Sequence, residues 1–272
     1  MNVLLDCAYG RTYYNIQAKE RKSMKIIKDI SYDCFEACKL DLYLPESNEF
    51  PIMVFFHGGG LEGGDKLSDV DVYESLVKSG IAVATADYRM YPDAKYPEFI
   101  EDAASAVKWV FHHIKEYGNC KEIYIAGSSA GAYLSMMLCF DKKYLGKHGI
   151  DPNEISGYIF DAAQPTTHFN VLRERGLDTR RVIIDDAAPI YHIGENPIEP
   201  PLMVLVADHD LPNRLEQTYL FCSTLKNFGY DEKKLTFKLM KGYNHVEYTH
   251  ATDSNGNNIF AEMIKDFIKS RK

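Results

Sequence analysis

The sequence predicts an α/β domain in which a mostly parallel, eight-stranded sheet carries helices on both faces. Strand-like apolar runs alternate along the chain with amphipathic helical segments, a pattern typical of parallel sheets. No internal repeat, low-complexity tract or long linker interrupts this alternation. Because 272 residues suffice for one large core, we expect a single domain over residues 1–272.

The N-terminal half supplies the expected edge of the sheet. Residues 25–32 and 38–44 predict an initial antiparallel pair of strands, and the apolar run at 51–56 predicts a buried strand. A helix at 70–79 and a strand at 81–86 follow. After a proline-bearing loop, residues 98–116 predict a long helix, since one side of it is apolar: Ala103, Ala104, Val107, Val110, Phe111 and Ile114.

The C-terminal half completes the sheet. The strand that ends near residue 128 is followed by expected strands at 155–162, 202–207 and 235–240, with a helix at 213–228 before the last of them. Apolar residues at helical spacing predict a closing helix at 259–270. Residues 165–201 are rich in charge and proline, and we expect them to form a small lid insertion rather than a second domain.

The composition is that of an ordinary globular protein, with 46% hydrophobic and 26% charged residues. A net charge of -8 argues against nucleic-acid and anionic-membrane partners. The N-terminal residues lack the features of a secretory signal, and no apolar run approaches the roughly 18 residues of a membrane span, so we expect a cytoplasmic protein. The scattered cysteines, of which Cys34 and Cys38 are the only close pair, predict no metal site.

A strand that enters a G-x-S-x-G sequence predicts the nucleophile of a hydrolase. Residues 123–131 read Ile-Tyr-Ile-Ala-Gly-Ser-Ser-Ala-Gly, with Ser129 at the centre and a helix-forming run behind it. We expect Ser129 to lie on a sharp, strained turn. Gly127 and Gly131 would remove side chains that otherwise collide with the neighbouring strand and helix.

A serine hydroxyl needs a base and an orienting carboxylate, and both follow Ser129 in the chain. His245 comes directly after the strand at 235–240, in a glycine-bearing loop. The acid is Asp208 or Asp210, both beyond the strand at 202–207, and side chains two apart in extended backbone point the same way. We favour Asp210, because the loop must clear the sheet before it turns back toward the histidine.

The glycines at 58–60 predict an oxyanion hole. They follow the strand at 51–56 and His57, and their amides can approach a substrate closely for want of side chains. We expect Gly59, Gly60 and the amide of Ala130 to be the donors. A phosphate-binding loop is disfavoured, because neither of the common phosphate-binding glycine motifs occurs.

With these motifs the chain resembles an α/β-hydrolase of the carboxylesterase type, close to the hormone-sensitive-lipase-like and feruloyl-esterase-like bacterial esterases. The resemblance extends from about residue 40 to the C-terminus and includes Asp87-Tyr88-Arg89 with Pro92 and Pro97. It implies a small-molecule ester substrate, no cofactor, and Ser129, Asp210 and His245 as nucleophile, acid and base. The sequence departs from it in the short segment before the first strand and in Leu61-Glu62, where relatives often have an aromatic residue.

The expected function is hydrolysis of short-chain or small aromatic carboxylic esters through an acyl-enzyme. An arylformamidase-type amide hydrolase and a carbohydrate acetyl esterase would use the same residues, because the choice of leaving group depends on loop shape. A non-catalytic binding module of the same fold is the alternative from another class. An exposed edge strand would allow a homodimer, and Tyr13 and Tyr14 belong either to a flap over the pocket or to the packed surface.

Overall fold

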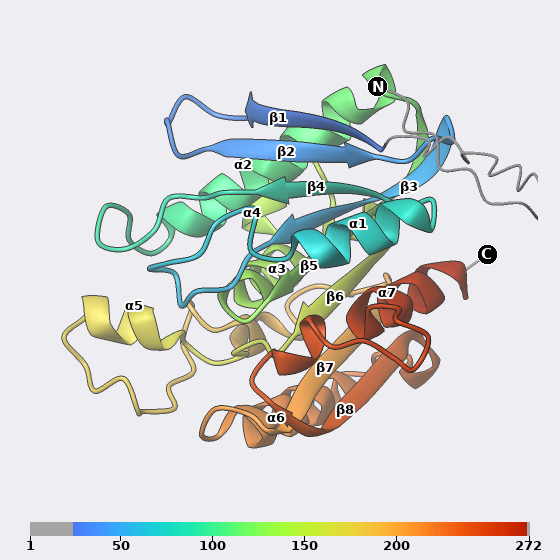
Figure 1. Ribbon diagram of the computed structural model, residues 1–272. Coiled ribbons are helices and arrows are strands. Elements are labelled where there is room, and N and C mark those ends of the chain that lie inside the picture. The colour runs from blue at the N-terminus through green and yellow to red at the C-terminus, as the bar shows by residue number, and fades with distance from the viewer. Residues whose placement is uncertain (1–23, 271–272) are drawn as a thin grey trace, which may run out of the picture.

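A single mixed sheet organises residues 24–270, which are the residues that the computed structural model describes (Figure 1). Its strand order is β1-β2-β4-β3-β5-β6-β7-β8, and all neighbours are parallel except β1 with β2 and β2 with β4. The strands are β1 (Lys25–Ser31), β2 (Lys39–Leu44), β3 (Glu49–Phe56), β4 (Ala82–Ala86), β5 (Asn119–Ser128), β6 (Gly157–Asp161), β7 (Leu202–His209) and β8 (Leu235–Asn244). The predicted α/β class with eight strands and an antiparallel edge is confirmed.

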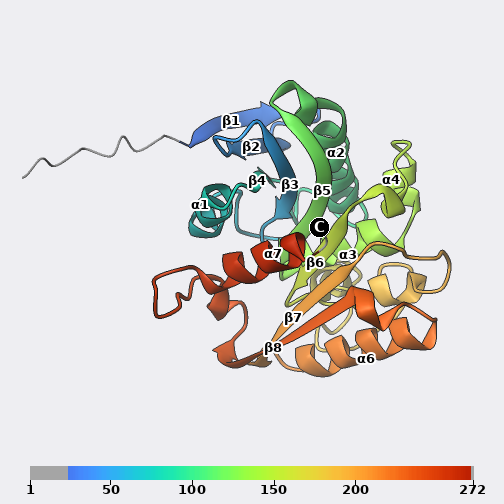
Figure 2. The same cartoon turned by 90° about the vertical axis from the view of Figure 1, so that its right-hand side faces the viewer.

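Helices cover both faces of the sheet, as predicted (Figure 2). The α-helices are α1 (Val70–Lys78), α2 (Glu98–His113), α3 (Ala130–Phe140), α4 (Lys143–Gly146), α5 (Phe169–Glu174), α6 (Arg214–Asn227) and α7 (Ile259–Lys269). The predicted helix at 98–116 is α2 continued by a 3₁₀ turn, η1 (Ile114–Glu116). Within residues 24–270, no helix combines the length and apolar character that crossing a bilayer requires. Tyr13 and Tyr14 lie outside the described residues.

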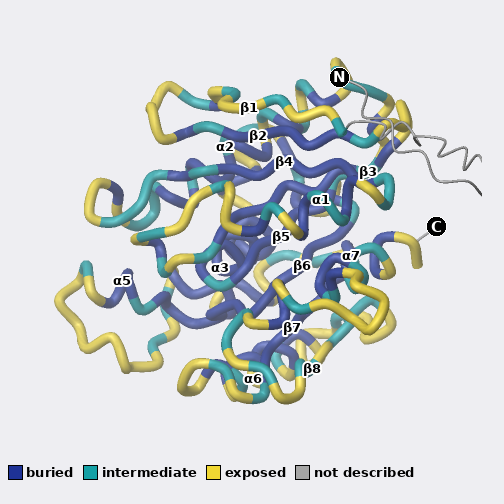
Figure 3. The backbone as a smooth tube through the Cα atoms, viewed as in Figure 1, coloured by how far each residue is buried: buried dark blue, intermediate teal, exposed yellow. Residues whose placement is uncertain are grey.

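The core has two parts because successive strand residues point to opposite faces of the sheet. In β3, Ile52 and Val54 pack on the side of α2 and α3, whereas Met53 and Phe55 pack on the side of α1 and α7. All four side chains are fully buried, and Figure 3 shows the central strands as the most buried part of the chain. A hydrophobic layer on each face therefore fixes the position of the strand ends where the site lies.

The segment at 165–201 contains α5 and projects beyond the sheet (Figure 1). Several of its charged residues form ion pairs, among them Arg175 with Asp185 at 2.6 Å. The hydroxyl of Tyr133 on α3 donates to the carbonyl of Ala187 at 2.8 Å and so connects the second half of the segment to the domain. This segment therefore packs on the domain through defined contacts.

Asp161, at the end of β6, is a fully buried carboxylate that links two parts of the chain near the site. Its Oδ2 accepts a hydrogen bond from Ser128 Oγ at 2.6 Å, and its Oδ1 accepts one from the hydroxyl of Tyr248. Burial raises the pKa of Asp161 to about 7, although the two hydrogen bonds oppose the shift. The end of β5 is thereby tied to the short 3₁₀ turn η5 (Glu247–Thr249), which directly follows His245 and Val246.

We predict that the free energy of unfolding of Gly131→Ala is lower than that of the wild type by about 2 kcal/mol or more. A Cβ at this position would lie 1.9 Å from the carbonyl oxygen of Phe56, a backbone atom that cannot move aside cheaply. Denaturant unfolding measures the loss. Gly146→Ala in α4 is the matched control, because its Cβ would meet nothing closer than 4.0 Å; equal losses in the two variants would contradict the prediction.

Because the pKa of Asp161 is raised, we predict that the difference in stability between the wild type and Asp161→Asn depends on pH. The pKa of Asp161 is raised on folding from 3.8 to about 7, so the folded chain holds this proton more tightly and is destabilised as the pH rises through that range. The unfolding free energy of the wild type relative to Asp161→Asn should fall by at least about 1 kcal/mol from about pH 5 to about pH 8. Thermal unfolding at several pH values tests this; a constant difference would exclude it.

Candidate active site

Ser129 occupies a tight turn between β5 and α3. Its φ of 53° and ψ of -111° lie outside the regions that a side chain normally allows, as expected for a strained turn. Its amide donates to the carbonyl of Asp161 at 2.8 Å. Added Cβ atoms at Gly127 and Gly131 would fall 2.3 and 1.9 Å from neighbouring backbone, so both positions require glycine, as the sequence predicts.

The structure brings Ser129, His245 and Asp210 together in one hydrogen-bonded chain. His245 Nε2 lies 2.8 Å from Ser129 Oγ, and His245 Nδ1 lies 2.6 Å from Asp210 Oδ1. Burial disfavours the charged form of Asp210, but the hydrogen bond and charge of His245 outweigh it and leave the pKa of Asp210 below its usual value. An ionised carboxylate therefore faces the imidazole, which in turn faces the serine hydroxyl.

Asp208 has a different environment from Asp210. It lies within β7, and its Oδ1 accepts a hydrogen bond from the amide of Gly242 in β8 at 2.7 Å. Asp210 is the first residue beyond the end of that strand, and its Oδ1 also accepts from the amide of Leu211 at 2.7 Å. Of the two candidate carboxylates, Asp210, which the sequence analysis favoured, is the one in contact with His245.

The glycine loop at 58–60 and Ser129 lie at the same cavity. Gly59 and Gly60 have φ values of 111° and 68°, which favour glycine, and a Cβ at Gly59 would lie 1.9 Å from the carbonyl oxygen of Gly63. Among the described residues, the amides of Gly59, Gly60 and Ala130 have no hydrogen-bond acceptor. Ala130 is also the first residue of α3, where the helix dipole favours negative charge.

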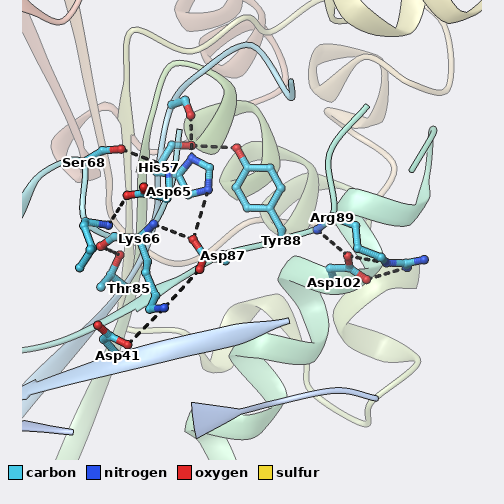
Figure 4. Close-up of polar contacts among 12 residues, drawn as sticks. Asp41, His57, Asp65, Lys66, Ser68, Thr85, Asp87, Tyr88, Arg89 and Asp102 are labelled. Carbon is cyan, nitrogen blue, oxygen red and sulfur yellow. Dashed lines mark hydrogen bonds and ion pairs between the residues drawn. The ribbon is translucent and has the colours of Figure 1, made fainter. Parts of the chain in front are cut away.

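His57 supports the glycine loop from inside the domain (Figure 4). It is fully buried, and burial lowers its pKa, so the ring is neutral. His57 Nδ1 donates to the carbonyl of Gly58 at 2.7 Å, and the ring stacks on Tyr88 with centroids 4.5 Å apart. The Tyr88 hydroxyl donates to the carbonyl of His57 at 2.9 Å. The loop is thus held at its first residue.

Ion pairs on both sides of Tyr88 hold this support in place (Figure 4). Lys66 Nζ lies 3.3 Å from Asp87 and 3.5 Å from the buried Asp41, and its amide donates to Asp87 at 2.6 Å. Arg89 donates to both carboxylate oxygens of Asp102 on α2, at 2.7 and 2.9 Å. The Asp87-Tyr88-Arg89 motif was visible in the sequence, but its partners were not, since they come from distant segments.

A cavity of about 490 Å³ opens at Ser129 and His245. Its wall includes the glycines at 58–60. Apolar side chains in the wall are Phe169, Leu211 and Val246, and polar ones are Glu62, Asp69 and His250. Phe169 and Asn170 bring the segment at 165–201 to the site, because Asn170 Nδ2 donates to the carbonyl of Gly60 at 3.1 Å. Among the described residues no group of three or more potential metal ligands gathers.

Sequence similarity covers the part of the chain that contains the glycine loop and Ser129. The family model BD-FAE matches residues 40–153. Esterase LipI of Mycobacterium tuberculosis is 34% identical over 38% of this chain and 32% of its own length. Kynurenine formamidase of Drosophila melanogaster is 24% identical over 78% of this chain and 72% of its own. The chain spans at most 48% of LipI and three similar relatives from Arabidopsis thaliana.

Structural similarity extends over nearly the whole chain. Esterase B from Lactobacillus rhamnosis, inhibited by a tributyrin phosphonate, has a TM-score of 0.74 at 17% identity and covers 92% of this chain and 87% of its own. An esterase from Pyrobaculum calidifontis has a TM-score of 0.71 at 21% identity, with 92% and 85% covered. The eight-stranded sheet and these similarities show that the chain shares the α/β fold of these esterases.

Proposed function

We propose that this protein is a serine hydrolase that cleaves short-chain or small aromatic carboxylic esters through an acyl-enzyme. The observation that carries the proposal is the hydrogen-bonded chain from Ser129 through His245 to Asp210, which lies beside backbone amides that have no acceptor among the described residues. This is the arrangement that activates a serine hydroxyl and stabilises an oxyanion.

The proposed first half-reaction transfers the acyl group to the enzyme. His245 Nε2 takes the proton of Ser129 Oγ while the oxygen attacks the ester carbonyl, and Asp210 stabilises the imidazolium that forms. The amides of Gly59, Gly60 and Ala130 donate to the developing oxyanion, helped by the N-terminus of α3. His245 then gives its proton to the leaving alcohol as the tetrahedral intermediate collapses.

The second half-reaction uses the same groups with water in place of the alcohol. His245 takes a proton from water as the water oxygen attacks the acyl carbonyl. It then returns that proton to Ser129 Oγ, which leaves as the intermediate collapses to the acid product. The 490 Å³ cavity fits a small substrate, and its apolar residues Phe169, Leu211 and Val246 provide room for a short acyl or aromatic group. No step requires a cofactor.

Hydrolysis of an aryl formamide is the second candidate. The similarity to the Drosophila kynurenine formamidase covers 78% of this chain, more than the similarity to LipI does. The same triad would attack a formamide carbonyl, and His245 would then protonate a leaving amine instead of an alcohol. A carbohydrate acetyl ester would differ from both in the shape of its leaving group.

We infer that residues 165–201 form a lid on this single domain. Phe169 lines the cavity, and its ring would be 2.9 Å from a Cβ at Gly60. Arg173 forms an ion pair with Glu62, which continues the glycine loop. These contacts join the segment to the oxyanion loop, so that a change in its position would change the wall of the substrate cavity.

Hydrolysis rates of nitrophenyl esters from acetate to decanoate, with methyl ferulate and N-formylkynurenine, test the proposal. The wild type should prefer short acyl chains, because the cavity is small. Ser129→Ala should lose roughly ten-thousandfold or more in kcat, since among residues 24–270 no other hydroxyl is hydrogen-bonded to His245. A rate on N-formylkynurenine far above every ester would favour the formamidase. A folded but inactive wild type would favour a binding module.

Asp210→Asn and Asp208→Asn form a matched pair within this test. Asp210→Asn should lower kcat by roughly a thousandfold, because an amide cannot hold and stabilise the imidazolium. Asp208→Asn should lower it by less than about tenfold, since the Asn oxygen can still accept from Gly242. Equal losses in the two variants would contradict the assignment of Asp210 as the acid.

A further inference from the structure

The proposed mechanism does not use one carboxylate in the cavity wall. Asp69 lies directly before α1 and lines the cavity with Ser129 and His245. Its side chain keeps 8% of its accessible surface. Although Asp69 holds the N-cap position of α1, its side chain accepts no hydrogen bond from the first turn of the helix. Within residues 24–270 no other hydrogen-bond donor contacts this carboxylate, so a nearly buried carboxylate in the cavity wall has no hydrogen-bond partner.

The neighbours of Asp69 leave its charge largely uncompensated. Of the basic side chains described, only His250 lies within 4 Å, with its Nε2 3.8 Å from Asp69 Oδ1 and so beyond hydrogen-bond distance. The other ring nitrogen of His250 faces Asp71 at 3.3 Å. Burial raises the pKa of Asp69 to about 6, and His250 opposes the shift. At neutral pH the carboxylate is still mostly ionised.

The second carboxylate of the cavity wall, Glu62, is paired. It binds the guanidinium of Arg173 and accepts a hydrogen bond from Asn170 Nδ2 at 3.3 Å. In the described part of the chain, no lysine or arginine lines the cavity. Unlike Glu62, Asp69 therefore has no hydrogen-bonded cationic partner among the described residues, and a bound ligand could supply one. A buried carboxylate without a partner is costly, and a cationic group would recover that cost where a neutral hydroxyl would not.

We propose that Asp69 forms a cation subsite in this cavity and that the natural substrate is an ester bearing an ammonium group. The inference rests on the proposed ester hydrolysis at Ser129. The cavity of about 490 Å³ has room for an ester carbonyl at Ser129 and an ammonium group at Asp69. Substrates with a carboxylate at this end would be repelled.

Acetylcholine and its neutral isostere 3,3-dimethylbutyl acetate test the subsite, because they differ in charge and hardly in shape. In the wild type, kcat/KM for acetylcholine should exceed that for the isostere roughly tenfold or more. Asp69→Asn should bring this ratio close to one. Glu74→Gln is the control, because it removes the same charge from α1 at a residue outside the cavity; it should keep the wild-type ratio.

Calorimetric titration of Ser129→Ala with the same two esters separates the subsite from the chemistry. Tighter binding of acetylcholine than of the isostere, lost when Asp69→Asn is added, would support the subsite. If the wild type also hydrolysed neither ester, the proposed hydrolysis would be refuted but the subsite would stand. Equal rates and equal binding of the two esters would overturn the subsite, as would a preference for acetylcholine that survives Asp69→Asn.

Discussion

The close backbone contact between the start of α3 and the end of β3 is the constraint on which the site depends. A Cβ at Gly131 would lie 1.9 Å from the carbonyl oxygen of Phe56 and 2.6 Å from that of His57. The helix therefore begins as near to the glycine loop as two backbones can approach. Ser129, the residue directly before the helix, and the loop amides consequently share one cavity, and neither could be displaced without the other.

Two carboxylates near Ser129 have opposite electrostatic environments. Asp210 is paired with His245, and its pKa lies below the usual value, whereas Asp161 is sealed in the core and its pKa is raised to about 7. This separation matches their contacts: the first holds an imidazole, and the second ties β5 to the turn after His245. Asp210 therefore acts through its negative charge, whereas Asp161 acts through the hydrogen bonds by which it connects two segments.

The sequence predicted the fold closely, because the apolar runs of the central strands and the helical periodicity of α2 and α7 were strong. It also indicated the order Ser129, Asp210, His245, since each follows an expected strand. It could not separate Asp208 from Asp210 by alternation; β7 extends to His209, so Asp208 remains in the sheet and bonds to β8. The roles of Asp161 and Lys66 were not predictable, because their partners lie far away in the chain and follow no local pattern.

Covalent trapping with a nitrophenyl alkylphosphonate, followed by peptide mass spectrometry, tests most directly whether Ser129 is an activated nucleophile. The reagent resembles the tetrahedral intermediate and releases nitrophenol when a hydroxyl attacks its phosphorus. The structure predicts one adduct per chain, on Ser129, formed at least about a hundredfold more slowly in His245→Ala, because the base is lost. An adduct on another residue, or a rate that does not change in His245→Ala, would contradict the account.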